Sequence, residues 1–178
     1  ASAVERELIP AQRQRFVLPS PTDRSARDQA YADALATVWK NHPTDADVGA
    51  LYAEALADLH PWDLWTADGE PKNGALEVIA ALDAVLALAP KHPLANHLYI
   101  HALEASPYPD RAIPAADVLR DLQPGLGHMV HMPSHIDIRT ARWAHAIAAN
   151  RKAIDADRAY QARAPAPQFY RLYIAHNY

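Results

Sequence analysis

Apolar residues recur along this chain with the spacing of an amphipathic helix, and prolines separate one such stretch from the next. Within residues 28–43 the apolar positions include Tyr31, Leu35 and Val38, and the pattern stops at Pro43. The same arrangement recurs in residues 45–61, 73–90, 93–107, 110–124 and 139–160. No pair of stretches alternates as two strands would, so the pattern predicts an all-α chain.

The helical stretches repeat with a period of 34 residues. Sliding the sequence by 34 lays Pro90 on Pro124, Ala112 on Ala146, His97 on His131 and His101 on His135. Sliding it by 50 lays His42-Pro43 on His92-Pro93, which implies an insertion between the first two copies, at residues 60–74. A repeating unit of helix, short loop and helix, closed by a proline, resembles the tetratricopeptide repeat (TPR).

The resemblance covers period more than residue identity, because the first helix lacks the family's usual tryptophan, glycine and tyrosine. It implies a TPR-like helical-hairpin solenoid with repeats at about 28–89, 93–124 and 127–160. Residues 1–27 are then a helical or loop segment. Residues 161–178 start a further helix, which we expect to continue past Tyr178 in the natural protein. The strings "ANHLYIHALEASPYP" and "GHMVHMPSHI" are similar to a group of bacterial TPR proteins.

Histidines are concentrated in residues 127–139, which hold His128, His131 and His135 out of ten in the chain. Their spacing of i, i+3 and i+7 puts them on one face of a helix. Pro133 leaves a second arrangement open: a helix that begins near Met132 would leave His128 and His131 on a preceding turn. The sequence does not decide between the two.

In the TPR family, fixed positions of the first helix face a concave groove. The resemblance assigns those positions to His97, His101 and Glu104 in one repeat and to His128, His131 and His135 in the next. Imidazole and carboxylate from facing helices are a donor set for zinc, copper, iron or nickel. We therefore expect His97, His101, His131 and His135 to bind a transition metal. Glu104 and His128 are expected as further ligands or orienting groups, and His176 and Glu54 as additional groove residues.

Composition removes several other classes of function. The net charge of −4 offers no basic excess for nucleic acid, and the absence of cysteine excludes disulfides and thiolate sites. No apolar run is long enough for a membrane span, and no signal peptide begins the chain, so cytoplasm and periplasm both stay open. The HExxH signature and a glycine-rich phosphate loop are absent. Hydrolysis, oxidation and metal carriage are equally open.

A second hypothesis needs no metal. A TPR groove binds a peptide or a partner helix, and histidines there would serve as hydrogen-bonding groups. The exposed ends of the repeats would then also permit self-association.

Overall fold

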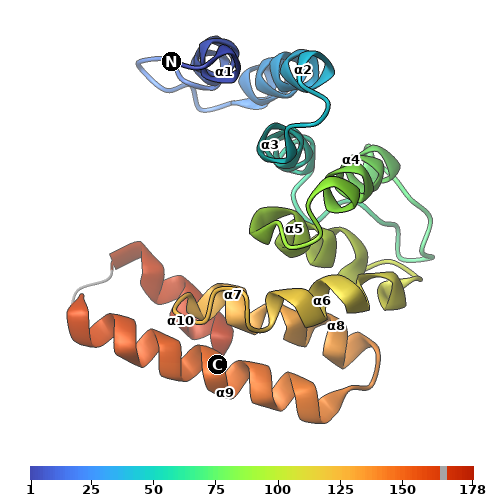
Figure 1. The fold of residues 1–178 in the computed structure, drawn as a ribbon, viewed down its shortest axis with the longest axis vertical. Coiled ribbons are helices and arrows are strands. Elements are labelled where there is room, and N and C mark those ends of the chain that lie inside the picture. The colour runs from blue at the N-terminus through green and yellow to red at the C-terminus, as the bar shows by residue number, and fades with distance from the viewer. Residues whose placement is uncertain (165–167) are drawn as a thin grey trace. The chain divides into compact units, whose positions relative to one another are not determined.

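The computed structural model describes residues 1–164 and 168–178, and helices dominate both parts (Figure 1). Within the described residues there is no strand, only an isolated antiparallel bridge between Trp65 and Pro71. The predicted all-α class is therefore confirmed. The chain divides into two compact units, Ala1–Leu98 and Tyr99–Tyr178, and the division falls inside one helix, α5 (Pro93–Glu104).

The first unit consists of helices that pack against their neighbours in sequence. They are α1 (Ala3–Arg15), α2 (Ser25–Asn41), α3 (Ala46–Ala57) and α4 (Ala75–Leu88). Consecutive helices pair, α1 with α2, α2 with α3 and α3 with α4, as in a series of helical hairpins. Leu35, Val48 and Leu82 are at most 1% exposed and form the core between these helices. The unit is held together mainly by buried aliphatic surface.

Local signals explain where these helices begin and end. The side chain of Asp45 accepts hydrogen bonds from the backbone N–H groups of Asp47 and Val48, at 3.1 and 3.2 Å, and so caps α3. Helix α2 stops before Pro43 and α4 stops before Pro90, because proline has no N–H to continue a helix. The predicted insertion lies in the non-helical connection between α3 and α4.

The second unit holds shorter helices around one long one. They are the end of α5, the 3₁₀ turn η1 (Pro109–Ala112), α6 (Ile113–Leu119), α7 (Gly127–His131), α8 (Pro133–Arg139), α9 (Trp143–Arg163), η2 (Gln168–Tyr170) and α10 (Arg171–Asn177). Helix α9 packs against α7, α8 and α10, and α10 also packs against α7. Ala146, Ala149 and Ala153 are at most 4% exposed, so small side chains let α9 approach its neighbours closely.

Pro133 does not break the helical register. It is the first residue of α8, the one helical position where its missing N–H costs nothing. Met132, between α7 and α8, has helical dihedral angles of −49° and −40°, and its N–H donates to the carbonyl of His128 at 3.0 Å. Helices α7 and α8 therefore adjoin with only Met132 between them, and His131 and His135 lie on either side of Pro133.

The predicted division of the chain into residues 1–27, 28–160 and 161–178 stays a prediction. Residues 165–167, in the last part, lie outside the described residues. Among the described residues no helix combines the length and the apolar character that crossing a membrane requires.

Candidate metal centre

The second unit gathers histidines from three separate stretches of sequence around one carboxylate. Helix α5 provides His101 and Glu104, the adjoining helices α7 and α8 provide three histidines, and α10 provides His176. Ring centroids of neighbouring histidines in this group lie 4.6 to 6.4 Å apart. The group is formed by His101, Glu104, His128, His131, His135 and His176, and is called the histidine cluster below.

Three nitrogens at the centre of the cluster point at one another. Nε2 of His131 lies 3.0 Å from Nε2 of His135 and 3.1 Å from Nε2 of His176. One nitrogen from each of the three residues lies within 4.8 Å of the other two. His131 is only 6% exposed, His135 is half-buried and His176 is exposed, so the group opens to solvent on the side of α10.

The opposite nitrogens of two of these rings are fixed by oxygen acceptors. Nδ1 of His131 lies 2.6 Å from Oδ1 of Asn150, on α9. Nδ1 of His135 lies 2.5 Å from Oε2 of Glu104. An amide oxygen and a carboxylate oxygen only accept, so Nδ1 of each ring carries a proton and donates it. In the neutral, metal-binding form of each ring the lone pair is therefore on Nε2, where the rings meet.

Two lone pairs that face each other at 3.0 Å repel unless a positive centre lies between them. A proton on Nε2 of His176 can be donated to only one acceptor fully, so it leaves the other lone pair unsatisfied. A metal ion accepts from all three nitrogens together. Tetrahedral zinc, with bonds of 2.0–2.1 Å, holds its nitrogen ligands about 3.3 Å apart. The observed 3.0 and 3.1 Å are close to that spacing.

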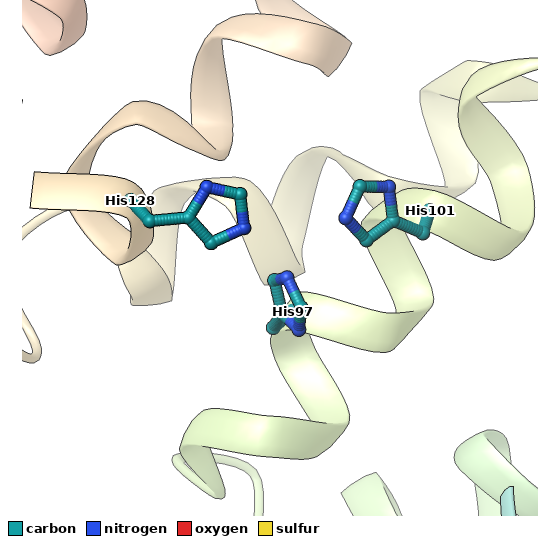
Figure 2. Close-up of side chains that lie close together, drawn as sticks. All are labelled: His97, His101 and His128. Atoms are coloured by element: carbon teal, nitrogen blue, oxygen red, sulfur yellow. The ribbon is translucent and has the colours of Figure 1, made fainter. Parts of the chain in front are cut away.

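His101 and His128 extend the cluster on the side of α5. Nδ1 of His101 lies 2.9 Å from Oε1 of Glu104, so one carboxylate orients two imidazoles. The rings of His101 and His128 stack with centroids 6.4 Å apart, and the ring of His101 lies 5.7 Å from that of His135. His97 stands one turn before His101 on α5 and shares its face of that helix (Figure 2).

Glu104 is an anion in this setting. Burial by itself would raise its pKa, but hydrogen bonds from His101 and His135 outweigh burial and lower the pKa to about 2. The carboxylate therefore stays charged at any physiological pH. It is available to offset the charge of a cation among the histidines.

The inner histidines are held neutral. Burial, followed by repulsion from the neighbouring imidazoles, lowers the pKa of His128 to about 4. Burial also lowers the pKa of His131 to about 4, although the hydrogen bond to Asn150 acts in the opposite direction. The pKa of His176 is lowered by burial and by His135. A neutral imidazole is the form that binds a metal, so His128, His131 and His176 are in their coordinating form at neutral pH.

The sequence-predicted residues fall into two groups. His101, Glu104, His128, His131, His135 and His176 belong to the cluster, whereas His97, on α5, and Glu54, on α3, lie in the first unit. Burial and then the charge of Asp58 raise the pKa of Glu54. That these residues bind a metal stays a prediction.

Two participants had no assigned role in the sequence pattern. Asn150 holds Nδ1 of His131, and the rings of Tyr173 and His128 meet in a T-shaped arrangement with centroids 4.9 Å apart. Asn150 follows the buried Ala149 and precedes the buried Ala153 on α9. A polar residue beside a stripe of small buried ones was the available signal.

The comparisons with known proteins support the fold alone. No family model matches the chain, and no curated protein sequence matches it. Among solved structures, "MamA 41-end from Desulfovibrio magneticus RS-1" and "MamA RS-1 ArsTM double mutant" are each similar with a TM-score of 0.64 at 16% identity, over 99% of this chain and 84% of theirs. With the helical hairpins described above, this likeness shows that the chain has a TPR-like helical-repeat fold.

Proposed function

We propose that this chain binds one transition-metal ion through Nε2 of His131, His135 and His176. The single observation that carries the proposal is the convergence of these three nitrogens, with Nδ1 of His131 and of His135 held by oxygen acceptors. In metal sites a histidine ligand usually donates its other N–H to a carboxylate or carbonyl. Glu104 and Asn150 are groups of that kind.

The donor set restricts the metal to those that favour imidazole. Three neutral nitrogens suit zinc, copper, iron or nickel, whereas magnesium and calcium prefer oxygen. Three protein ligands leave a further position for water or a substrate, which is the arrangement of catalytic zinc sites rather than of closed structural ones. From the sequence we expected His97 and His101 among the main ligands together with His131 and His135, whereas the convergence of nitrogens favours His176 in their place. His101 and His128 are the candidates for further ligands.

Metal analysis of protein without a histidine tag tests the proposal directly. We expect one equivalent of zinc, copper or nickel to bind, and His135→Ala to weaken the affinity at least 100-fold, in line with the loss of one of three ligands. His145→Ala is the matched control, because His145 is an exposed histidine of the same unit, on α9. Glu104→Gln replaces one of the two carboxylate oxygens that accept from His101 and His135, and should weaken metal binding about 10–100-fold. Equal affinity in wild type and His135→Ala overturns the proposal.

Protein–protein interaction is a second candidate function, favoured by the TPR-like fold itself. Phe169, Leu172 and Tyr178 are 66–71% exposed on the C-terminal segment, an apolar surface of the kind that partners cover. If self-association uses this surface, sedimentation of Leu172→Asp should show only monomer where the wild type forms larger species. A wild type that is monomeric at all concentrations removes self-association from consideration.

A further inference from the structure

The last helix of the chain is fastened to the second unit by a buried carboxylate that the metal proposal does not use. Asp157, on α9, is 1% exposed. Its Oδ1 accepts a hydrogen bond from the Tyr170 hydroxyl at 2.8 Å, and its Oδ2 accepts one from Nδ2 of Asn177 at 2.8 Å. Asn177 is the last residue of α10 and is itself fully buried. Both ends of the segment 170–177 are thus held by one side chain.

The carboxylate also packs against the start of α7. A Cβ added to Gly127 would lie 2.0 Å from Oδ1 of Asp157, so a larger residue at that position would displace the carboxylate. Burial and then the hydrogen bond to Asp157 raise the pKa of Tyr170 to about 12, which keeps its hydroxyl protonated as the donor. Asp157 therefore joins α7, η2 and α10, the elements around His128, His131 and His176.

Helix α10 depends on this attachment. It has seven residues, and a helix of that length is not stable in water by itself. His176 immediately precedes Asn177, and its Nε2 lies 3.1 Å from that of His131. The hydrogen bond between Asn177 and Asp157 thus sets where the imidazole next to it lies.

We propose that Asp157 is a positioning residue that docks α10 so that His176 completes the metal centre. Docking of α10 and binding of the metal then stabilise each other, because an ion that binds only the docked state shifts the equilibrium towards it. This inference rests on the proposed metal site. It adds that the ion's affinity is set by the fraction of molecules in which α10 is docked.

Hydrogen exchange and zinc affinity, measured on the whole chain, test the two halves of the inference. In metal-free protein, Asp157→Ala should speed amide exchange across residues 171–177, and zinc should slow exchange there in the wild type. The same substitution should weaken zinc binding about 10–100-fold, as for other groups that orient a ligand. Asp155→Ala is the control, because Asp155 is exposed on the same helix and pairs only with the exposed Arg158 among the contacts described. It should change neither measurement.

Exchanging the side chains of Asp157 and Asn177 separates a positioning role from a general loss of stability. Asn177→Asp alone places two buried carboxylates opposite each other, where like charges repel. Adding Asp157→Asn restores a carboxylate opposite an amide with the net charge of the wild type. The double variant should recover α10 protection and most of the zinc affinity, and it decides the matter if Asp157→Ala fails to fold. Double and single variants that behave alike overturn the inference.

Spectra of protein loaded with cobalt or copper show whether a nitrogen ligand is lost, and so identify why a variant binds zinc more weakly. His176→Ala should lose one nitrogen ligand while α10 stays protected in the metal-free state, and Asp157→Ala should lose the same nitrogen together with that protection. If the wild type binds no zinc, the metal proposal fails and the coupling with it. If the wild type binds zinc but Asp157→Ala frees α10 without changing the affinity or the nitrogen count, the metal proposal stands and the positioning role of Asp157 is wrong.

Discussion

The two units of this chain have interiors of different chemistry. Large aliphatic side chains such as Leu35, Leu82 and Val85 fill the first unit, where Asn96 is the single buried polar side chain among the described residues. In the second unit the buried polar side chains are Ser106, His131, Ser134, Asp137, Asp157 and Asn177. Apolar burial is non-directional, whereas each buried polar group needs a specific partner.

The difference shows what each unit contributes. Buried polar groups weaken a fold unless they are satisfied, but once satisfied they fix side chains in definite positions. In the second unit the two carboxylate oxygens of Asp137 accept hydrogen bonds from the guanidinium of Arg120 at 3.0 and 3.1 Å. Asp157 accepts from Tyr170 and Asn177, and His131 is hydrogen-bonded to Asn150. The first unit is built mainly from non-directional apolar contacts, and the second holds polar side chains in definite positions.

The largest loss of stability is expected from a substitution that disrupts the polar interior of the second unit. Asp137→Ala should destabilise the protein by about 3–5 kcal/mol, because it leaves the charge of Arg120 largely buried without its partner. Asp117→Ala is the matched control, since Asp117 contacts Arg120 and Arg142 at 3.0 and 2.7 Å but is 46% exposed. It should cost about 0–1 kcal/mol. Denaturant unfolding gives both values, and equal losses would show that burial of Asp137 is unimportant.

Breaking the apolar interior of the first unit should be nearly as costly but should leave the metal centre intact. Leu82 is fully buried in α4, so Leu82→Ala should cost about 2–5 kcal/mol through lost burial and the cavity it leaves. Leu88, 46% exposed at the end of the same helix, is the control and should change stability by about 0.5 kcal/mol or less when replaced by alanine. The zinc affinity of the folded Leu82→Ala protein should match that of the wild type. A lower affinity would contradict the separation of roles.

Acid should destabilise the second unit specifically. The pKa values of His128 and His131 are lowered from 6.5 to about 4, so between these values the unfolded chain binds protons that the folded chain does not. Stability therefore falls as pH drops from about 6.5 to about 4. It falls further between about 4.5 and 2, where Glu104 is protonated in the unfolded chain but not in the folded one, in which its pKa is about 2. Unfolding of metal-free protein measured across this range checks the sign. His131→Gln should reduce the slope, and a flat profile would contradict the prediction.

The smallest effect is expected for a polar pair of the second unit that is not buried. Nζ of Lys152 lies 2.6 Å from Oδ1 of Asp121, but the two side chains are 55% and 75% exposed. Lys152→Ala should change the free energy of unfolding by about 0–1 kcal/mol, and less in high salt. A loss as large as that of Asp137→Ala would mean that surface pairs, and not the polar interior, distinguish this unit.

The sequence by itself determined the helical class, the repeat and several helix ends. These depend on local properties: apolar spacing sets the buried face of a helix, and Pro43 and Pro90 follow α2 and α4 because proline cannot continue their hydrogen bonds. The 34-residue offset also aligned Ala112 with Ala146, and both are buried. The spacing of His131 and His135 is one helical turn, but the sequence left open whether a helix begins near Met132. The structure ends α7 at His131 and begins α8 at Pro133.

Only the tertiary structure decided which groups meet these two histidines. His176 was expected only as an additional groove residue. It lies 45 residues from His131, and Asn150 lies 19 residues from it, so the local sequence specifies neither contact. The repeat register brought Glu104 into the prediction but did not show that its two oxygens hold Nδ1 of His101 and of His135. Asp157 gave no signal at all, because its role arises from Gly127, Tyr170 and Asn177 packing around it. Such contacts depend on how α7, α9 and α10 pack together, and packing depends on the shapes of all the side chains between them rather than on any spacing along one helix.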